Sequence, residues 1–218
     1  MIDIIIFAII AAVIAYRLYN TLGAEDNNSE EVRGKVINLH PISEDDEDKS
    51  QEIEDEHNLA DQLIEDKLSK INLTNIKKII AKDAKFSSSK FLKNTEKAFE
   101  IIIESFANGQ KDALNKLCKK EIATKYINEY ENQKKKGNKI NINLIGIESA
   151  SIETISVKEN IANIKIKFIS EQISYVTDKN NKIISGDEKK IEVIDDKWVF
   201  ERNLADKSPI WLLSKTEN

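Results

Sequence analysis

The spacing of apolar residues changes from helical to alternating near residue 139. Before this point an apolar residue recurs every three or four positions, and the longest stripe comprises Phe91, Thr95, Ala98, Phe99, Ile102, Ile103 and Phe106. After it, apolar and polar residues alternate, as in Ile140, Ile142 and Leu144 and again in Ile164, Ile166 and Phe168. Helices followed by antiparallel strands predict an α+β domain, with three helices on one face of a curved four-stranded sheet around an apolar pocket.

Residues with capping and turn preferences set the predicted element boundaries. Ser87 to Ser89 offer an N-cap for the first helix and Gly109 a stop, and further helices are predicted over 111–118 and 121–136. The phase break at Ile145-Gly146-Ile147 indicates a bulge, and residues 178–181 indicate a turn. One late strand is predicted to start near Ile191 and to reach Arg202, and another to follow Pro209 over 210–213.

The N-terminus carries an uninterrupted apolar run over residues 4–16. We predict a transmembrane anchor at 1–23, because 4–22 provides 19 residues and a span needs about 20. A cleaved signal peptide is the alternative, but the only early charge is Asp3. Arg17, Arg33 and Lys35 follow the run, which predicts an inner (plasma) membrane protein with its C-terminal domain in the cytoplasm. The anchor residues are Ile4, Ile5, Ile6, Phe7, Ile9, Ile10, Val13, Ile14, Tyr16 and Arg17.

Acidic residues concentrate in the first part of the chain. Residues 1–89 hold 10 basic and 18 acidic side chains, whereas residues 90–218 hold 23 and 20. Residues 24–57 contain few large apolar side chains, so we predict an acidic disordered linker there. It serves either as a solvated spacer or as an acidic patch that docks on a basic partner. The net charge of −5 argues against a general nucleic-acid binder, and no DNA partner is expected.

Two lysine-rich segments are candidates for contact with anionic lipid. Residues 58–86 form a predicted amphipathic segment, broken near Asn72–Asn75. In one interpretation Lys77, Lys78, Lys82 and Lys85 face lipid headgroups while Ile76, Ile79 and Ile80 enter the interface; in the other, the helix packs on its own domain. The run Lys134, Lys135 and Lys136 either binds anionic lipid or nucleic acid, or complements the end of a helix dipole before Gly137.

The sequence offers little for catalysis. Both histidines, His40 and His57, precede the predicted domain at 87–218, and the chain has a single cysteine, Cys118, at an apolar helical position. Asp195 and Asp196 are adjacent on a predicted strand and therefore point to opposite faces. We predict a non-enzymatic protein with no metal and no cofactor. A pocket enzyme of the isomerase or dehydratase type is the less favoured alternative.

Several strings at the C-terminal end match a family signature. They are Asp196-Lys-Trp198-Val-Phe200-Glu-Arg202, Ser208-Pro209-Ile-Trp211-Leu-Leu213 with Thr216, and the strand Ile166 to Gln172 with Phe168. They resemble the signature of the mitochondrial inner-membrane translocase subunit 44 (Tim44-like domain) family, whose bacterial members are TimA-type adaptors. Phe91 and Ala98 to Ala107 are similar to the first domain helix of that family. Val199 and Ile210 depart from the family pattern, which has Thr and Asn there.

This resemblance implies a nuclear-transport-factor-2-like (cystatin-like) domain in a membrane-tethered adaptor. The implied partners are a DnaK-type chaperone, translocase subunits or a ribosome, together with cardiolipin or another anionic lipid. A ribosome–membrane linker and a lipid- or hydrophobic-ligand-binding module are the alternatives. Trp198 and Phe200 are expected in the core, with Arg202 stacked on an aromatic ring or paired with an acid and Trp211 closing the pocket rim. Direct contact of these residues with a ligand is the other interpretation.

Overall fold

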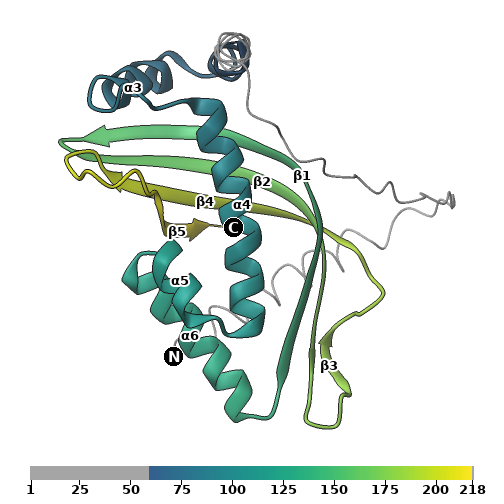
Figure 1. Cartoon of the computed structure of the whole chain (residues 1–218). Coiled ribbons are helices and arrows are strands. Elements are labelled where there is room, and N and C mark those ends of the chain that lie inside the picture. Colours follow the sequence, from purple (N-terminus) through teal and green to yellow (C-terminus); the bar gives the residue numbers. More distant parts are fainter. Residues whose placement is uncertain (1–58, 218) are drawn as a thin grey trace, which may run out of the picture. The chain divides into compact units, whose positions relative to one another are not determined.

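The computed structural model describes residues 59–217, which form helices packed on an antiparallel sheet. Figure 1 shows α4 crossing one face of the sheet, with α5 and α6 beside it and α3 near the other end of the strands. The predicted α+β class is confirmed. The elements are α3 (Lys70–Ile80), α4 (Ser88–Asn108), α5 (Lys111–Leu117), α6 (Lys120–Lys135), β1 (Lys139–Lys158), β2 (Ile161–Thr177), β3 (Ile183–Gly186), β4 (Glu192–Asn203) and β5 (Leu212–Glu217).

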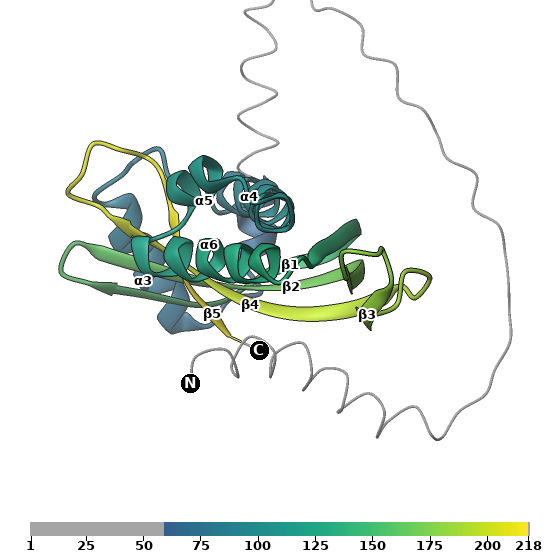
Figure 2. The same ribbon diagram turned by 90° about the horizontal axis from the view of Figure 1, so that it is seen from below.

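The sheet has five strands, so the expectation of four was wrong. Its order is β1-β2-β4-β5. The short β3 pairs with the last residues of β2, beyond Gln172, where the pairing of β2 with β4 ends. The predicted turn at 178–181 is confirmed, because the Asp178 amide donates to Lys182 O at its close. Ile183–Gly186 is too short to show a period, which is why the sequence did not reveal this strand. Figure 2 shows the curvature of the long strands beneath the helices.

The alternation of side chains along β2 decides which face of the sheet is covered. Ile164, Ile166 and Phe168 are fully buried, while Lys165 and Lys167 lie on the opposite face, as predicted. The predicted bulge is confirmed, because the pairing of β1 with β2 shifts between Leu144 and Gly146. Two further shifts follow in β1, and each adds bend and twist to the strand.

Helix α4 begins and ends where its sequence predicts. The Ser87 hydroxyl accepts from the Lys90 amide at 3.2 Å, which caps the N-terminus. Gly109 adopts φ 67° at the C-terminus, and an added Cβ there would collide with the Tyr130 ring. Its stripe enters the core, with Phe91, Phe99 and Ile102 almost completely buried.

The predicted break at Asn72–Asn75 was wrong, because α3 runs through both residues. The chain turns earlier, at residues 66–69, and Ser69 caps α3 by accepting from the Asn72 amide. Asn72 and Asn75 are buried and hydrogen-bond to the edge of β1, so tertiary contacts offset their weak helix propensity. Ile76 and Ile79 are buried in the domain core, which confirms the interpretation that this helix packs on its own domain. Insertion of these two isoleucines into lipid is therefore contradicted in this conformation.

The last strand is displaced from its predicted position at 210–213. β5 runs from Leu212 to Glu217, and Ile210 and Trp211 lie before it in the connection from β4. Pro209 has no amide hydrogen to donate, and Trp211 packs on aromatic rings near the start of α4. These contacts hold the segment outside the ladder of β4 and β5.

The predicted anchor at 1–23 and acidic linker at 24–57 lie outside the described residues. Within residues 59–217, no helix is both long enough and apolar enough to span a bilayer. The segment from residue 59 to α3 attaches to the start of α4, where Asp61 Oδ1 accepts from the Ser89 amide at 2.7 Å. Residues before the expected domain boundary at Ser87 thus contribute to the same core.

Candidate functional site

The buried signature residues form an aromatic layer between α4 and the sheet. Phe99 of α4 stacks on Phe168 of β2 at 4.5 Å between ring centroids and lies 4.6 Å from Trp198 of β4. Phe200 continues the layer at 6.4 Å from Trp198. All four side chains are at most 4% exposed. They fill the space in which the sequence predicted an apolar pocket. Their position supports the interpretation that Trp198 and Phe200 are core residues.

A second aromatic group joins this layer at the start of α4. Trp211 lies 4.9 Å from Phe91 in an edge-to-face arrangement and 6.1 Å from Phe86. Phe91 in turn meets Phe200 edge-on at 6.3 Å. Trp211 therefore packs the β4–β5 connection against the aromatic layer.

Arg202 pairs with an acid, one of the two alternatives that the sequence left open. Its Nη1 lies 2.7 Å from Asp83 Oδ2, and its Nε donates to Ser208 O at 3.0 Å. The hydrogen bond from Arg202 is the main cause that lowers the pKa of Asp83 below its ordinary value. The guanidinium thus joins three segments: β4, the β4–β5 connection and the link between α3 and α4. Asp83 was not among the predicted site residues.

Asp196 is a carboxylate on the helix-covered face of β4. Burial raises its pKa to about 6, although a hydrogen bond from the Trp198 side chain favours the charged form. Tyr126 of α6 lies close to it, and burial is the main cause that raises the pKa of the Tyr126 hydroxyl. Asp195 faces the other way and pairs with Lys167 at 2.9 Å, as the strand geometry predicts. The two aspartates therefore do not form a dyad.

Cys118 is a buried thiol at the end of α5. It is 3% exposed, and burial raises its pKa to about 12. A thiol of this kind stays protonated at neutral pH and is a poor nucleophile. Its neighbour Lys119 donates its amide to Leu213 O at 2.8 Å, so this segment connects the helices to β5. Within residues 59–217, no cluster of His, Cys, Asp or Glu is arranged to hold a metal ion.

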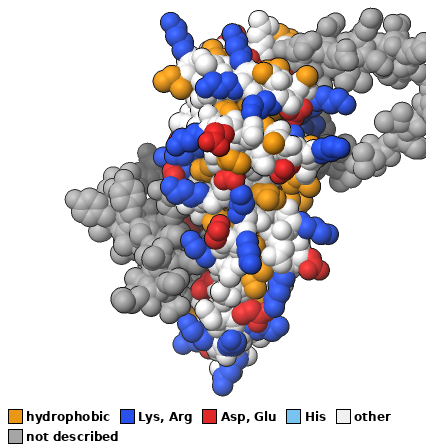
Figure 3. Space-filling view, turned by 90° about the vertical axis from the view of Figure 1, so that its left-hand side faces the viewer, with side chains coloured by type: hydrophobic (Ala, Val, Ile, Leu, Met, Phe, Trp, Pro, Cys, Tyr) orange, Lys and Arg blue, Asp and Glu red, His pale blue; other side chains and the backbone are white. Residues whose placement is uncertain are grey.

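The candidate lipid-contact lysines lie at two separate places. Lys77 and Lys78 are exposed on α3, and Lys82 donates to Glu159 O at the β1–β2 turn. Lys134, Lys135 and Lys136 end α6, followed by Gly137 with φ 76°, which agrees with the predicted helix stop. The space-filling view in Figure 3 shows lysine and arginine side chains along the whole length of one face of the molecule.

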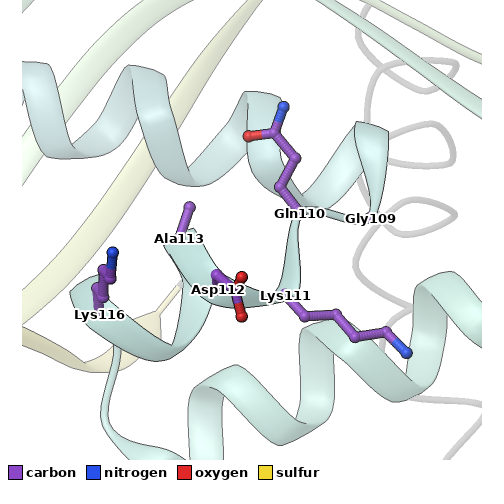
Figure 4. Close-up of a pocket in the computed structure, with 6 residues that line it drawn as sticks. All are labelled: Gly109, Gln110, Lys111, Asp112, Ala113 and Lys116. Carbon is purple, nitrogen blue, oxygen red and sulfur yellow. The ribbon is translucent and has the colours of Figure 1, made fainter.

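Two of the hollows on the described surface lie outside the aromatic layer. One, of about 690 Å³, is lined by residues of the α4–α5 turn and of α5, namely residues 109–113 and Lys116. Figure 4 shows that its side chains point in different directions and do not converge on a common point. The other, of about 210 Å³, is lined by the ends of α4 and α6 and by the start of β1, including Tyr130, Lys134 and Lys139.

Comparison with known proteins identifies a family that this sequence matches. The sequence profile described as the Tim44-like domain matches residues 74–218. The mitochondrial import inner membrane translocase subunit TIM44-1 of Arabidopsis thaliana is 24% identical over 143 residues, which cover 63% of this chain. The match spans 30% of that relative's own length.

Two solved structures show partial likeness. The intermembrane space region of the chloroplast protein ARC6 matches with a TM-score of 0.41 and 11% identity, covering 58% of this chain and 94% of that structure. A de novo designed β-sheet protein matches with a TM-score of 0.30 and 10% identity, covering 59% and 86%.

Proposed function

The chain belongs to the Tim44-like domain family, and from that premise we propose that it is a membrane-anchored, non-catalytic adaptor. In this proposal the C-terminal domain, a nuclear-transport-factor-2-like cone of helices on a curved sheet, binds a protein partner at the inner (plasma) membrane. The observation that carries the proposal is the family match over residues 74–218, which takes in α4, the sheet and every signature residue.

The signature residues hold the fold, so a partner would have to be recognised by other residues of the domain. Phe168, Trp198 and Phe200 are buried in the aromatic layer, and Arg202 is bonded to Asp83 and Ser208. Side chains committed to internal contacts hold the fold and are not free to contact a partner. A partner would therefore recognise exposed residues of the domain, where lysines are abundant.

The proposed division of the chain explains how such an adaptor would work. Residues 1–23 would anchor the chain, residues 24–57 would tether it, the segment 58–86 would lead into the domain, and 87–218 would bind. A tether of this length confines the domain near the membrane, so a weak contact with a partner at the same membrane is occupied more often than it would be in free solution. The name of the Arabidopsis relative points to a translocase as the setting, and a DnaK-type chaperone or translocase subunits are the proposed partners.

The test is cross-linked affinity purification of the full chain from solubilised membranes, followed by mass spectrometry. A matched bait consisting of residues 1–57 alone removes the domain and controls for proteins captured through the anchor and tether. Recovery of a DnaK-type chaperone or translocase subunits with the full chain only would support the proposal. Ribosomal proteins would indicate a ribosome–membrane linker instead. Copurified lipid with no protein partner would require the adaptor to be abandoned.

A further inference from the structure

The side of the sheet that faces away from α4, α5 and α6 carries one charged residue among apolar ones; we call this side the outer face. Figure 2 shows the three helices on the opposite side of the long strands. In β2, Phe168 and Ser170 are fully buried on the helix-covered side, so the residues that alternate with them lie on the outer face. There Glu171 is exposed, and Ile169 and Ile173 on either side of it are half-buried.

The neighbouring strands complete an apolar frame around the Glu171 side chain. Glu171 pairs with Val193 of β4 and with Gly146 of β1, and residues paired in this way share a face of the sheet. Val193 is 45% exposed, and a Cβ added to Gly146 would meet no atom within 4 Å, so the space above this glycine is open. We call Gly146, Ile169, Glu171, Ile173 and Val193 the outer patch.

Glu171 differs from the other charged residues on the outer face of β2 and β4. Those residues have partners within the chain: the pairs are Lys165–Glu217, Lys167–Asp195, Lys197–Glu153 and Lys119–Glu201. No ion pair found within residues 59–217 involves Glu171. Lys167, the nearest lysine on the same row of β2, is held 2.9 Å from Asp195. The charged residue of β1 nearest in sequence to Gly146 is Glu148, which is another acid.

A carboxylate in an apolar frame is suited to a cation that is itself surrounded by apolar groups. Burial of the aliphatic side chains would exclude water, and the attraction between the two charges would become stronger in the lower dielectric. We propose that the outer patch is the docking surface for the protein partner, through a helix that presents one Lys or Arg between aliphatic side chains. This inference rests on the proposed adaptor function and names the surface that performs it.

The spacing of the outer patch fits a helix that lies along β2. Ile169 and Ile173 are four residues apart in a strand, which is about 13 Å. Positions i and i+8 of a helix are about 12 Å apart on one face, with position i+4 between them. Aliphatic residues at i and i+8 would therefore cover the two isoleucines while a cation at i+4 meets Glu171. An extended segment has a similar spacing, but its backbone groups would lie unpaired on the apolar frame.

Two other occupants are disfavoured by the same carboxylate. A surface of anionic lipid would be repelled by Glu171. A second copy of this chain, packed patch to patch about a two-fold axis, would bring two Glu171 carboxylates together in an apolar contact, which is costly. The charge of the outer patch therefore favours a cationic protein surface.

The test is photo-cross-linking in membranes with p-benzoylphenylalanine in place of Tyr175, which follows Ile173 on the outer face. Mass spectrometry of the adduct should identify a partner helix with a Lys or Arg between aliphatic residues. Glu171→Lys should lower the adduct yield about tenfold or more, because it places two cations in contact. Changing the partner's cation to Glu should restore the yield with this variant. The same cross-linker in place of Ile101, which is 45% exposed on α4, should not give this adduct.

A matched variant separates docking from stability. Glu171→Lys should leave the urea midpoint of the domain unchanged, since no ion pair within the described residues is lost. Glu100→Lys makes the same change at an exposed acid of α4 and should leave the adduct yield unchanged. An undiminished yield with Glu171→Lys, adducts with lipid only, or adducts only between copies of this chain would each overturn the inference.

Affinity purification with the same variant distinguishes this inference from the adaptor function. Recovery of a DnaK-type chaperone or translocase subunits by the original chain but not by Glu171→Lys would support both. Equal recovery by the two chains would refute the docking surface and leave the adaptor function in place. Recovery of no protein by either chain would refute the adaptor function and the docking surface with it.

Discussion

At the scale of single residues, two carboxylates with shifted pKa values make the stability of the domain depend on pH. Asp196 is held against aromatic rings with a pKa of about 6, which is above that of an aspartate in an unfolded chain. Asp83 is held by Arg202, and its pKa is lowered. The two carboxylates therefore act in opposite directions, because the first favours the folded state when it is protonated and the second when it is charged.

We predict that Asp196→Asn stabilises the domain at neutral pH. The folded state binds a proton at Asp196 more tightly than the unfolded state does, so stability falls as pH rises from about 4 to 6. An uncharged amide removes this penalty, with a gain of about 1–3 kcal/mol at pH 7.5 that disappears near pH 4. Urea denaturation at both pH values measures the effect. Asp195→Asn on the opposite face is the control, and an equal loss of stability at both pH values for Asp196→Asn would contradict the prediction.

Arg202 and Asp83 should be strongly coupled in a double-mutant cycle. Arg202→Met leaves the Asp83 carboxylate without its main partner, and the expected cost is about 1–3 kcal/mol because the guanidinium is mostly buried. Adding Asp83→Asn should recover part of this loss. The exposed pair Lys111–Glu131 provides the reference cycle, where a much smaller coupling energy is expected because solvent screens the two charges. Similar coupling energies in the two cycles would show that Arg202 has no special structural role.

At the scale of elements, α3 closes part of the free edge of the sheet. β1 is an edge strand, and its Ile155 amide donates to Asn72 Oδ1 at 2.9 Å. Asn72 Nδ2 donates to Glu153 O, and Asn75 Nδ2 donates to Ile155 O. Two asparagine amides thus take the place of a neighbouring strand. Elsewhere in β1 the register shifts disturb the edge, which also hinders pairing with other chains.

Removing these amides should loosen α3 without unfolding the sheet. In Asn72→Ala/Asn75→Ala, the buried amide and carbonyl of Ile155 lose their partners, at a cost of about 1–3 kcal/mol for each unsatisfied group. Hydrogen exchange at Ile155 should accelerate much more than exchange at Ile166 in the middle of the sheet. Thr74→Ala on the exposed side of α3 is the matched control and should leave the Ile155 amide protected. Equal acceleration at both amides in the double variant would mean that α3 supports the whole fold.

At the scale of the whole molecule, charge and hydropathy divide the chain into parts with different tasks. The apolar run at 4–16 precedes an acidic stretch at 44–56, which in turn precedes a domain with a positive net charge. In the proposed adaptor, this order places the anionic tether between the membrane and a lysine-rich domain. In that proposal, the length of the tether would limit how far the domain reaches from the membrane.

We predict that the N-terminal run anchors the chain in the membrane. The full chain should remain in the membrane pellet after alkaline carbonate extraction, because a helix spanning the bilayer is not released by breaking ionic contacts. A variant with Ile10→Lys and Val13→Lys places two charges in the centre of the run and should be released. Complete release of the unmodified chain would show that the N-terminal run binds the membrane only peripherally.

The sequence determined the features of this protein that depend on neighbouring residues. The stripe from Phe91 to Phe106, the cap at Ser87, the stop at Gly109 and the alternation around Ile166 each specify an element through local spacing. The family signature was likewise visible in the sequence, and the family profile confirms it. These features could be predicted because their physical causes act within one or two turns of a helix or along a single strand.

Only the tertiary structure decided what depends on distant partners. Asn72 continues a helix because it bonds to Ile155, 83 residues away, and Arg202 pairs with Asp83, 119 residues away. Phe99 fills the space where a pocket was expected, and Lys179 joins the lysines at the end of α6 through the pairing of β1 and β2. Local periodicity contains no information about such contacts, since each is specified by where the folded chain brings two remote segments together.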